Sequence, residues 1–114
     1  DRNDKVILDN RNNIPIQVYS AETASIMNRL LTYNVNNCAH TFASYAGVYG
    51  WDIAGKTGTT NDDKDSWFCG GSSYCTLAVW TGFDYPESIS KIEDFDLLTY
   101  NMFYFRHTLS LCLK

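Results

Sequence analysis

The sequence predicts an α+β fold in which an antiparallel three-stranded meander is flanked by two helices. Two observations carry this prediction. Three strand-like runs follow one another closely within residues 51–83, and an amphipathic stretch lies on either side of them in the chain. The chain has 114 residues, 45% of them hydrophobic, so it is at most one domain and is not a disordered polymer.

The first helix is predicted over about residues 21–33. Ser20 is a residue type that caps helix N-termini, and Glu22 places a negative charge in the first turn, where the helix dipole favours it. Apolar residues three or four positions apart predict a buried stripe made of Ile26, Met27, Leu30 and Leu31. Upstream, residues 5–8 predict a short strand and residues 10–13 a loop.

The three strands are expected over about residues 51–59, 66–71 and 74–83. The cluster Gly70-Gly-Ser-Ser73 predicts the hairpin turn between the last two. Along the third strand two sets of side chains alternate between the faces, with Cys75, Leu77 and Val79 on one side and Thr76, Ala78 and Trp80 on the other.

A terminal helix is predicted over about residues 96–113 and would cover one face of the sheet. Its apolar stripe consists of Leu98, Met102, Phe105, Leu109 and Cys112, again three or four positions apart. Between the first helix and the strands, residues 34–50 show no clear period and predict a loop with room for one short helix.

Charge and cysteine content exclude several classes of function. The net charge is −4 and the nine Lys and Arg residues are scattered, whereas nucleic-acid binders carry a basic face. The four cysteines lack the paired C-x-x-C spacing of a zinc site, and His40 and His107 lie far apart, so no metal or other cofactor is expected. Buried free thiols are favoured, with a disulfide between Cys69 and Cys75 as the alternative.

The stretch Gly55-Lys56-Thr57-Gly58-Thr59 is the candidate functional segment. On a strand, Thr57 and Thr59 face one side and Lys56 and Gly58 the other. Glycines in a strand indicate close approach of a backbone or ligand, and threonine hydroxyls beside a lysine can hold a carboxylate. An edge strand of this composition can bind an extended peptide by strand addition.

Two other interpretations of this stretch remain. A strand end rich in glycine and threonine is often only a twist or a bulge. In addition, Gly50 and Gly55-Lys56-Thr57 together satisfy the phosphate-loop pattern G-x-x-x-x-G-K-[ST]. That motif requires an apolar strand before it and a helix after the lysine, and the flanking residues favour neither.

The longer string Gly55-Lys-Thr-Gly-Thr-Thr-Asn-Asp-Asp-Lys-Asp-Ser-Trp-Phe-Cys-Gly70, with Ala78-Val-Trp-Thr-Gly-Phe-Asp84, resembles the end of the transpeptidase domain of class A penicillin-binding proteins, the bifunctional peptidoglycan synthases. Phe83 stands where that family has tyrosine, and Cys69 where it has valine. The resemblance implies a β-lactamase-like fold, of which residues 1–114 would be an incomplete C-terminal portion carrying the third, fourth and fifth strands.

The resemblance also implies roles for residues in the lysine strand. Lys56 would supply positive potential and support proton transfer beside a catalytic serine. The hydroxyls of Thr57 and Thr59 would bind the carboxylate of a stem peptide ending in D-Ala-D-Ala, or of a β-lactam that mimics it. The backbone N–H of Thr59 would form half of the oxyanion hole, and Gly58 would keep the strand unobstructed. Trp67, Phe68 and Trp80 are expected to pack rather than react.

The nucleophile of that family lies in a Ser-x-x-Lys motif, and a Ser-x-Asn motif completes its site, both N-terminal to Lys-Thr-Gly. No Ser-x-Asn occurs here, and Ser88-Ile-Ser-Lys91 follows the lysine strand in what reads as a surface connection. The chain alone is therefore expected to be inert, with the remaining N-terminal part of the same protein supplying the serine.

Three alternatives to a D,D-transpeptidase stay open on the sequence. One is a D,D-carboxypeptidase, in which water replaces the acceptor amine, and the second is a non-catalytic β-lactam-binding or sensor module. The third is an α+β domain whose Lys-Thr-Gly arises by chance. From the resemblance alone, the parent protein is expected to be anchored at the extracytoplasmic face of the bacterial membrane, with no anchor in this chain.

Overall fold

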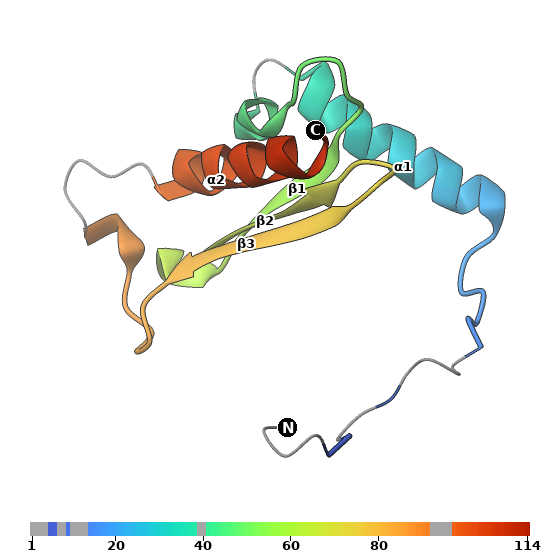
Figure 1. The fold of residues 1–114 in the computed structure, drawn as a ribbon. Coiled ribbons are helices and arrows are strands. Elements are labelled where there is room, and N and C mark those ends of the chain that lie inside the picture. The colour runs from blue at the N-terminus through green and yellow to red at the C-terminus, as the bar shows by residue number, and fades with distance from the viewer. Residues whose placement is uncertain (1–4, 7–8, 10–13, 39–40, 92–96) are drawn as a thin grey trace.

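The computed structural model describes residues 5–6, 9, 14–38, 41–91 and 97–114. Helix α1 (Ala21–Asn36) precedes strands β1 (Ala54–Thr59), β2 (Asp65–Gly71) and β3 (Thr76–Gly82), and helix α2 (Leu97–Cys112) follows them. Three short 3-10 turns, η1 (Phe42–Ala46), η2 (Asn61–Asp63) and η3 (Ile89–Lys91), lie in the connections. The strands form an antiparallel sheet in the order β1-β2-β3, with α2 along one face and α1 beside β1 (Figure 1). This confirms the predicted α+β meander.

Helix α1 begins where Ser20 predicted it, because the Ser20 hydroxyl accepts a hydrogen bond from the Thr23 N–H at 3.2 Å. Hydrogen bonds from its own backbone N–H, and then from Ser20, lower the pKa of the Glu22 carboxyl, as suits the positive end of a helix. The helix continues three residues beyond the predicted end, to Asn36. The strand predicted at residues 5–8 is not formed at Lys5 and Val6, and residues 7–8 and 10–13 lie outside the described parts.

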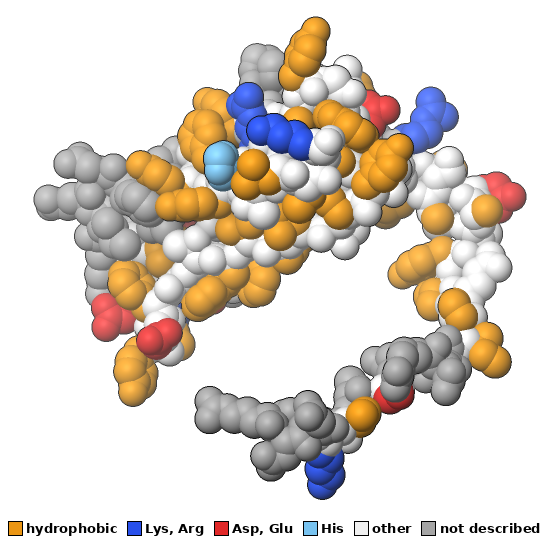
Figure 2. Space-filling view, viewed as in Figure 1, with side chains coloured by type: hydrophobic (Ala, Val, Ile, Leu, Met, Phe, Trp, Pro, Cys, Tyr) orange, Lys and Arg blue, Asp and Glu red, His pale blue; other side chains and the backbone are white. Residues whose placement is uncertain are grey.

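The predicted burial of the α1 stripe is wrong. Ile26, Met27 and Leu30 are 61%, 53% and 60% exposed, Leu31 is only half-buried, and Val35 is the buried residue of this helix. The reason is that α1 meets the sheet through its C-terminal half, while its N-terminal half extends past it (Figure 1). Hydrophobic side chains consequently remain on the surface along α1 and the segment leading into it (Figure 2).

The core lies between the sheet and α2. The predicted stripe of α2 is confirmed where Met102, Phe105 and Leu109 are fully buried, although Cys112 is exposed and the side chain of Leu98 lies outside the described part. Phe105 meets Phe68 of β2 edge to face, with ring centroids 4.6 Å apart. The main core is completed by Val35, Ala43, Ala46 and Ile53.

A buried polar contact fixes where α2 lies along the sheet. Asn101 is 1% exposed, and its amide nitrogen donates to the backbone oxygen of Ser66 at 2.8 Å and to the Ser66 hydroxyl at 2.9 Å. The Thr81 hydroxyl donates to the Asn101 side-chain oxygen. Because buried amides must be paired, α2 can satisfy Asn101 only in this register over β2 and β3.

The predicted hairpin exists, but its turn is later than expected. Gly70 and Gly71 are the last residues of β2, and the turn is closed by the Ser72 N–H donating to the Cys75 carbonyl at 3.0 Å. A Cβ at Gly70 would come within 2.4 Å of the Ala54 oxygen, and one at Gly71 within 2.4 Å of the Cys75 oxygen. These glycines are therefore required by close backbone approach rather than by turn geometry.

The four cysteines are free thiols, as favoured, but they are not buried. Cys69 and Cys112 are exposed, and Cys38 and Cys75 are half-buried. Cys69 pairs with Ala78 across the sheet, so its side chain lies on the face opposite to that of Leu77 and Val79, which pack on the core. The alternative disulfide between Cys69 and Cys75 is therefore wrong, because alternation puts the two side chains on opposite faces.

Candidate active-site strand

Lys56, Thr57, Gly58 and Thr59 all lie on β1, the edge strand of the sheet. β1 pairs with β2 along one side only, with Lys56 opposite Cys69 and Gly58 opposite Trp67. The segment is thus an edge strand, as the sequence predicted, but it is only partly exposed: Lys56 and Thr59 are exposed, Thr57 and Gly58 are half-buried, and Gly55 is buried. The phosphate-loop interpretation is contradicted, because Lys56 and Thr57 lie inside a strand and are followed by the short turn η2, not by an α-helix.

Backbone direction along β1 places two residues of the motif at the free margin. The Gly55 carbonyl accepts from the Asn34 side-chain nitrogen of α1 at 2.9 Å, so it points away from β2. The Thr60 N–H donates to the Asp65 carbonyl and so points inward. Because backbone groups alternate along a strand, the N–H and C=O groups of Thr57 and Thr59 point outward. Asn34 anchors β1 without any signal in the sequence that marks this role.

Lys56 lies on the opposite face from the threonine side chains, yet it reaches the margin. Its Nζ donates to the Thr57 carbonyl at 3.0 Å and to the Thr57 hydroxyl at 3.2 Å. Both acceptors are neutral, so within the described residues no carboxylate offsets the charge of Lys56. The ammonium group, the Thr57 hydroxyl and the outward N–H groups therefore gather at one margin, where they can bind an anion.

The two glycines of the motif serve different purposes. A Cβ at Gly55 would lie 2.6 Å from the Phe68 ring, whereas one at Gly58 would lie 3.4 Å from Trp67 Cβ, an ordinary contact. Gly55 is thus required for core packing. The fold does not require glycine at position 58. The absence of a side chain at this position leaves space on the face of the sheet that carries Lys56.

This difference predicts opposite outcomes for two matched substitutions. Gly55→Ala should destabilise the sheet by about 1–3 kcal/mol, because the added methyl group overpacks the Phe68 ring. Gly58→Ala should change stability by less than about 1 kcal/mol. Hydrogen exchange of the β2 amides measures both effects, and equal protection in the two variants would contradict the assignment.

The Lys56 face of the sheet carries aromatic side chains beside a hollow. Trp67 and Trp80 pair across β2 and β3 with ring centroids 6.3 Å apart, and they are 40% and 44% exposed. Trp80 Nε1 donates to the Asp65 carboxylate at 2.8 Å. The two tryptophans therefore pack against each other, as expected, but at the surface. A hollow of about 580 Å³ on this face is lined by Lys56 but not by Thr57, Gly58 or Thr59.

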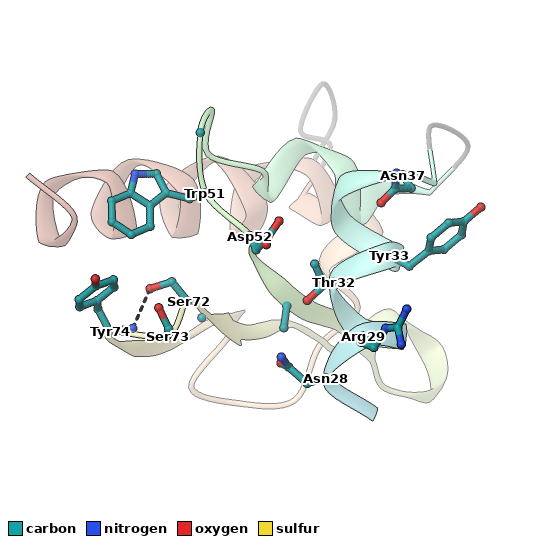
Figure 3. Close-up of a pocket in the computed structure, with 13 residues that line it drawn as sticks. Asn28, Arg29, Thr32, Tyr33, Asn37, Trp51, Asp52, Ser72, Ser73 and Tyr74 are labelled. Atoms are coloured by element: carbon teal, nitrogen blue, oxygen red, sulfur yellow. Dashed lines mark hydrogen bonds between the residues drawn. The ribbon is translucent and has the colours of Figure 1, made fainter. Parts of the chain in front are cut away.

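A second hollow, of about 710 Å³, lies between α1, the segment before β1 and the hairpin turn (Figure 3). Its lining includes Arg29, Asp52, Trp51 and Tyr74, the last two in an edge-to-face contact at 5.4 Å. Ala54, the first residue of β1, borders it, but Lys56, Thr57 and Thr59 do not, so the hollow lies at the start of the strand and away from the motif.

Ser88 is half-buried, and its hydroxyl shares a hydrogen bond of 2.6 Å with Ser90. It lies beyond the end of β3, just before η3, and its hydrogen-bond partner is a second serine rather than a base. This geometry agrees with the expectation that Ser88 is not the nucleophile. Within the described residues no cluster of metal-ligating side chains occurs, and no helix there is long and apolar enough to cross a bilayer.

Comparison with known proteins gives the family. A penicillin-binding protein 1A of Clostridium acetobutylicum is 42% identical over 90 residues, which are 79% of this chain and 11% of that protein. Penicillin-binding proteins 1A of Pseudomonas aeruginosa and Neisseria meningitidis are 57% and 56% identical over 42 and 41 residues, 37% and 36% of this chain and 5% of each relative.

No family model matches the sequence. The chain spans about a tenth or less of the length of the relatives that it matches. The identity nevertheless extends over most of the chain in the first of them and rises above one half in the shorter matches. The chain therefore belongs, as a fragment, to the class A penicillin-binding proteins.

Proposed function

We propose that this chain forms the Lys-Thr-Gly wall of the active site of a serine-type D,D-transpeptidase, which cross-links peptidoglycan stem peptides and is acylated by β-lactams. The observation that carries the proposal is the open margin of β1, where Lys56 Nζ lies 3.0 Å from the Thr57 carbonyl and the Thr59 N–H points outward. Membership of the penicillin-binding family supports it.

In this proposal the terminal carboxylate of the stem peptide binds to the hydroxyls of Thr57 and Thr59, within the positive potential of Lys56. The scissile carbonyl oxygen accepts from the Thr59 N–H, which stabilises the oxyanion as the serine attacks. Loss of the terminal D-alanine leaves an acyl-enzyme, and an amine of a second stem then displaces the serine.

The serine comes from the remaining N-terminal part of the same protein. Two surfaces suit contact with that part: the α1 stripe, with Ile26, Met27 and Leu30 more than half exposed, and the Lys56 face with its exposed tryptophans. Apolar patches of this kind mark contact surfaces. We further propose, from the family resemblance, that the parent protein lies at the extracytoplasmic membrane face and carries a glycosyltransferase domain.

Lys56→Ala in the full-length protein tests the role of the lysine. Its acylation by a fluorescent penicillin should slow by a factor of about 10² or more, because proton transfer and positive potential are lost together. Lys64→Ala is the matched control, since Lys64 pairs with the surface carboxylate of Asp62 at 3.3 Å outside the strand. Equal slowing in both variants would contradict a specific role for Lys56.

Peptide mapping of the labelled protein separates the alternatives. The acyl group should lie on a serine outside residues 1–114, so labelling of Ser88 would overturn the proposal. Reversible binding without an acyl adduct would favour a sensor. With stem peptides as substrate, release of D-alanine without cross-linked product would favour a carboxypeptidase.

A further inference from the structure

Cys75 and Cys112 lie at corresponding ends of two facing surfaces. Cys75 immediately precedes β3. Because side chains alternate along a strand, Cys75 lies on the same face as Leu77 and Val79, which pack on the core. Cys112 ends the α2 stripe that contains Phe105 and Leu109. Because both surfaces face the same core, the two thiols are directed toward the same rim of it.

The register between α2 and β3 brings these ends together. Asn101 contacts Thr81, which fixes one point of the helix against the strand. The 11 residues from Asn101 to Cys112 advance the helix by about 16 Å at about 1.5 Å per residue. The same length of strand, at about 3.3 Å per residue, covers about five residues and leads from Thr81 back to Thr76. Cys112 is therefore expected to lie opposite the start of β3.

The side-chain contacts agree with this register. Cys75 and Leu113 both pack against the core cluster that contains Leu109, and Leu113 directly follows Cys112 in the chain. Partial burial, and then the neighbouring Cys112, raise the pKa of the Cys75 thiol. Cys112 is exposed and Cys75 half-buried, so an oxidant in solution can reach the pair.

We propose that Cys75 and Cys112 form a disulfide that ties the start of β3 to the C-terminal turn of α2 when the protein meets an oxidising disulfide. The exposed Cys112 thiolate attacks a sulfur of the oxidant, and one oxidant thiolate leaves. The Cys75 thiolate then attacks Cys112 Sγ in the mixed disulfide, and the second oxidant thiolate leaves. Two protein thiols are thereby oxidised, the oxidant is reduced to two thiols, and the cysteine protons pass to the leaving thiolates.

Such a bond would join the two ends of the chain segment that contains β3 and α2 into a covalent loop. Disulfides persist in oxidising compartments, which is where the proposed function places this protein, but the bond itself requires no active site. A crosslink between the hairpin and the last turn of α2 constrains the unfolded chain and should hold the helix on the sheet.

The test uses the full-length protein incubated with oxidised glutathione, with a parallel sample kept reduced. Remaining thiols are blocked with N-ethylmaleimide before digestion without reductant. Trypsin leaves Cys69 and Cys75 together on residues 65–91 and Cys112 on residues 107–114, so a second cleavage by chymotrypsin after Tyr74 separates the first two. The expected product is a peptide containing Cys75 linked to one containing Cys112, lighter by two hydrogens than the reduced pair.

Two sets of variants test which cysteines form the bond. Cys75→Ser and Cys112→Ser should each abolish the linked peptide, whereas Cys38→Ser and Cys69→Ser should leave it unchanged. Maleimide on both Cys75 and Cys112 after oxidation would overturn the proposal, as would linkage of either to another cysteine. Penicillin labelling is measured separately, so failure of the disulfide and failure of the transpeptidase assignment are distinguishable.

Discussion

Thr59→Pro should lower the rate of acylation by a β-lactam by a factor of about 10²–10³, the usual loss when one oxyanion donor is removed. Proline has no backbone N–H, and the N–H of Thr59 points to the open margin rather than to β2. Edge strands tolerate proline where the lost N–H faces away from the ladder, so the sheet should survive. The measurement is the second-order rate of labelling by a fluorescent penicillin.

Thr59→Val separates the hydroxyl from the backbone donor. It keeps the N–H and loses only one hydrogen bond to the carboxylate, so its acylation should slow by about 10–100-fold. Hydrogen exchange at β2 shows whether each variant keeps the sheet. If Thr59→Pro retains β2 protection and is still acylated at the wild-type rate, the oxyanion role of Thr59 is wrong.

Phe68→Ala should cost about 3–5 kcal/mol in free energy of unfolding, the largest stability effect expected in this chain. Phe68 is fully buried, meets Phe105 edge to face at 4.6 Å and fills the space above Gly55. Its removal leaves a cavity between β1 and α2 that rigid neighbours cannot fill. Loss of hydrogen-exchange protection in β1 and β2 measures the effect.

Phe103→Ala is the matched control for this change. Phe103 lies on the same helix as Phe105 but is 46% exposed, with a tilted ring contact to Tyr45 at 5.8 Å. The same truncation there should cost about 1 kcal/mol or less. Comparable losses in the two variants would mean that the Phe68–Phe105 contact is not the centre of the core.

Local sequence patterns predicted the elements well because each depends on nearby residues. Ser20 caps α1, alternation marks β3, and the three-to-four spacing of Met102, Phe105 and Leu109 marks the face of α2 that covers the sheet. The margin at residues 57–59 followed from its composition, since glycine and threonine beside lysine suit an open strand better than a core strand.

The errors concern what each surface contacts, which no short stretch encodes. The α1 stripe at Ile26, Met27 and Leu30 has the same periodicity as that of α2, yet it is exposed because only the C-terminal half of α1 meets the sheet. Gly70 and Gly71 read as a turn, although they are strand residues placed against neighbouring backbone. The pairing of Asn34 with Gly55 depends on two elements far apart in sequence.

The unpaired margin of β1 also has a consequence for colloidal behaviour. The outward N–H groups of Thr57 and Thr59 can pair with any extended chain, including another molecule of the same protein, and so favour edge-to-edge aggregation. Lys56 opposes this, because two copies meeting margin to margin would bring their ammonium groups together. The charge that suits an anionic peptide thus also protects the strand from its own copies, and neutralising it would favour self-association.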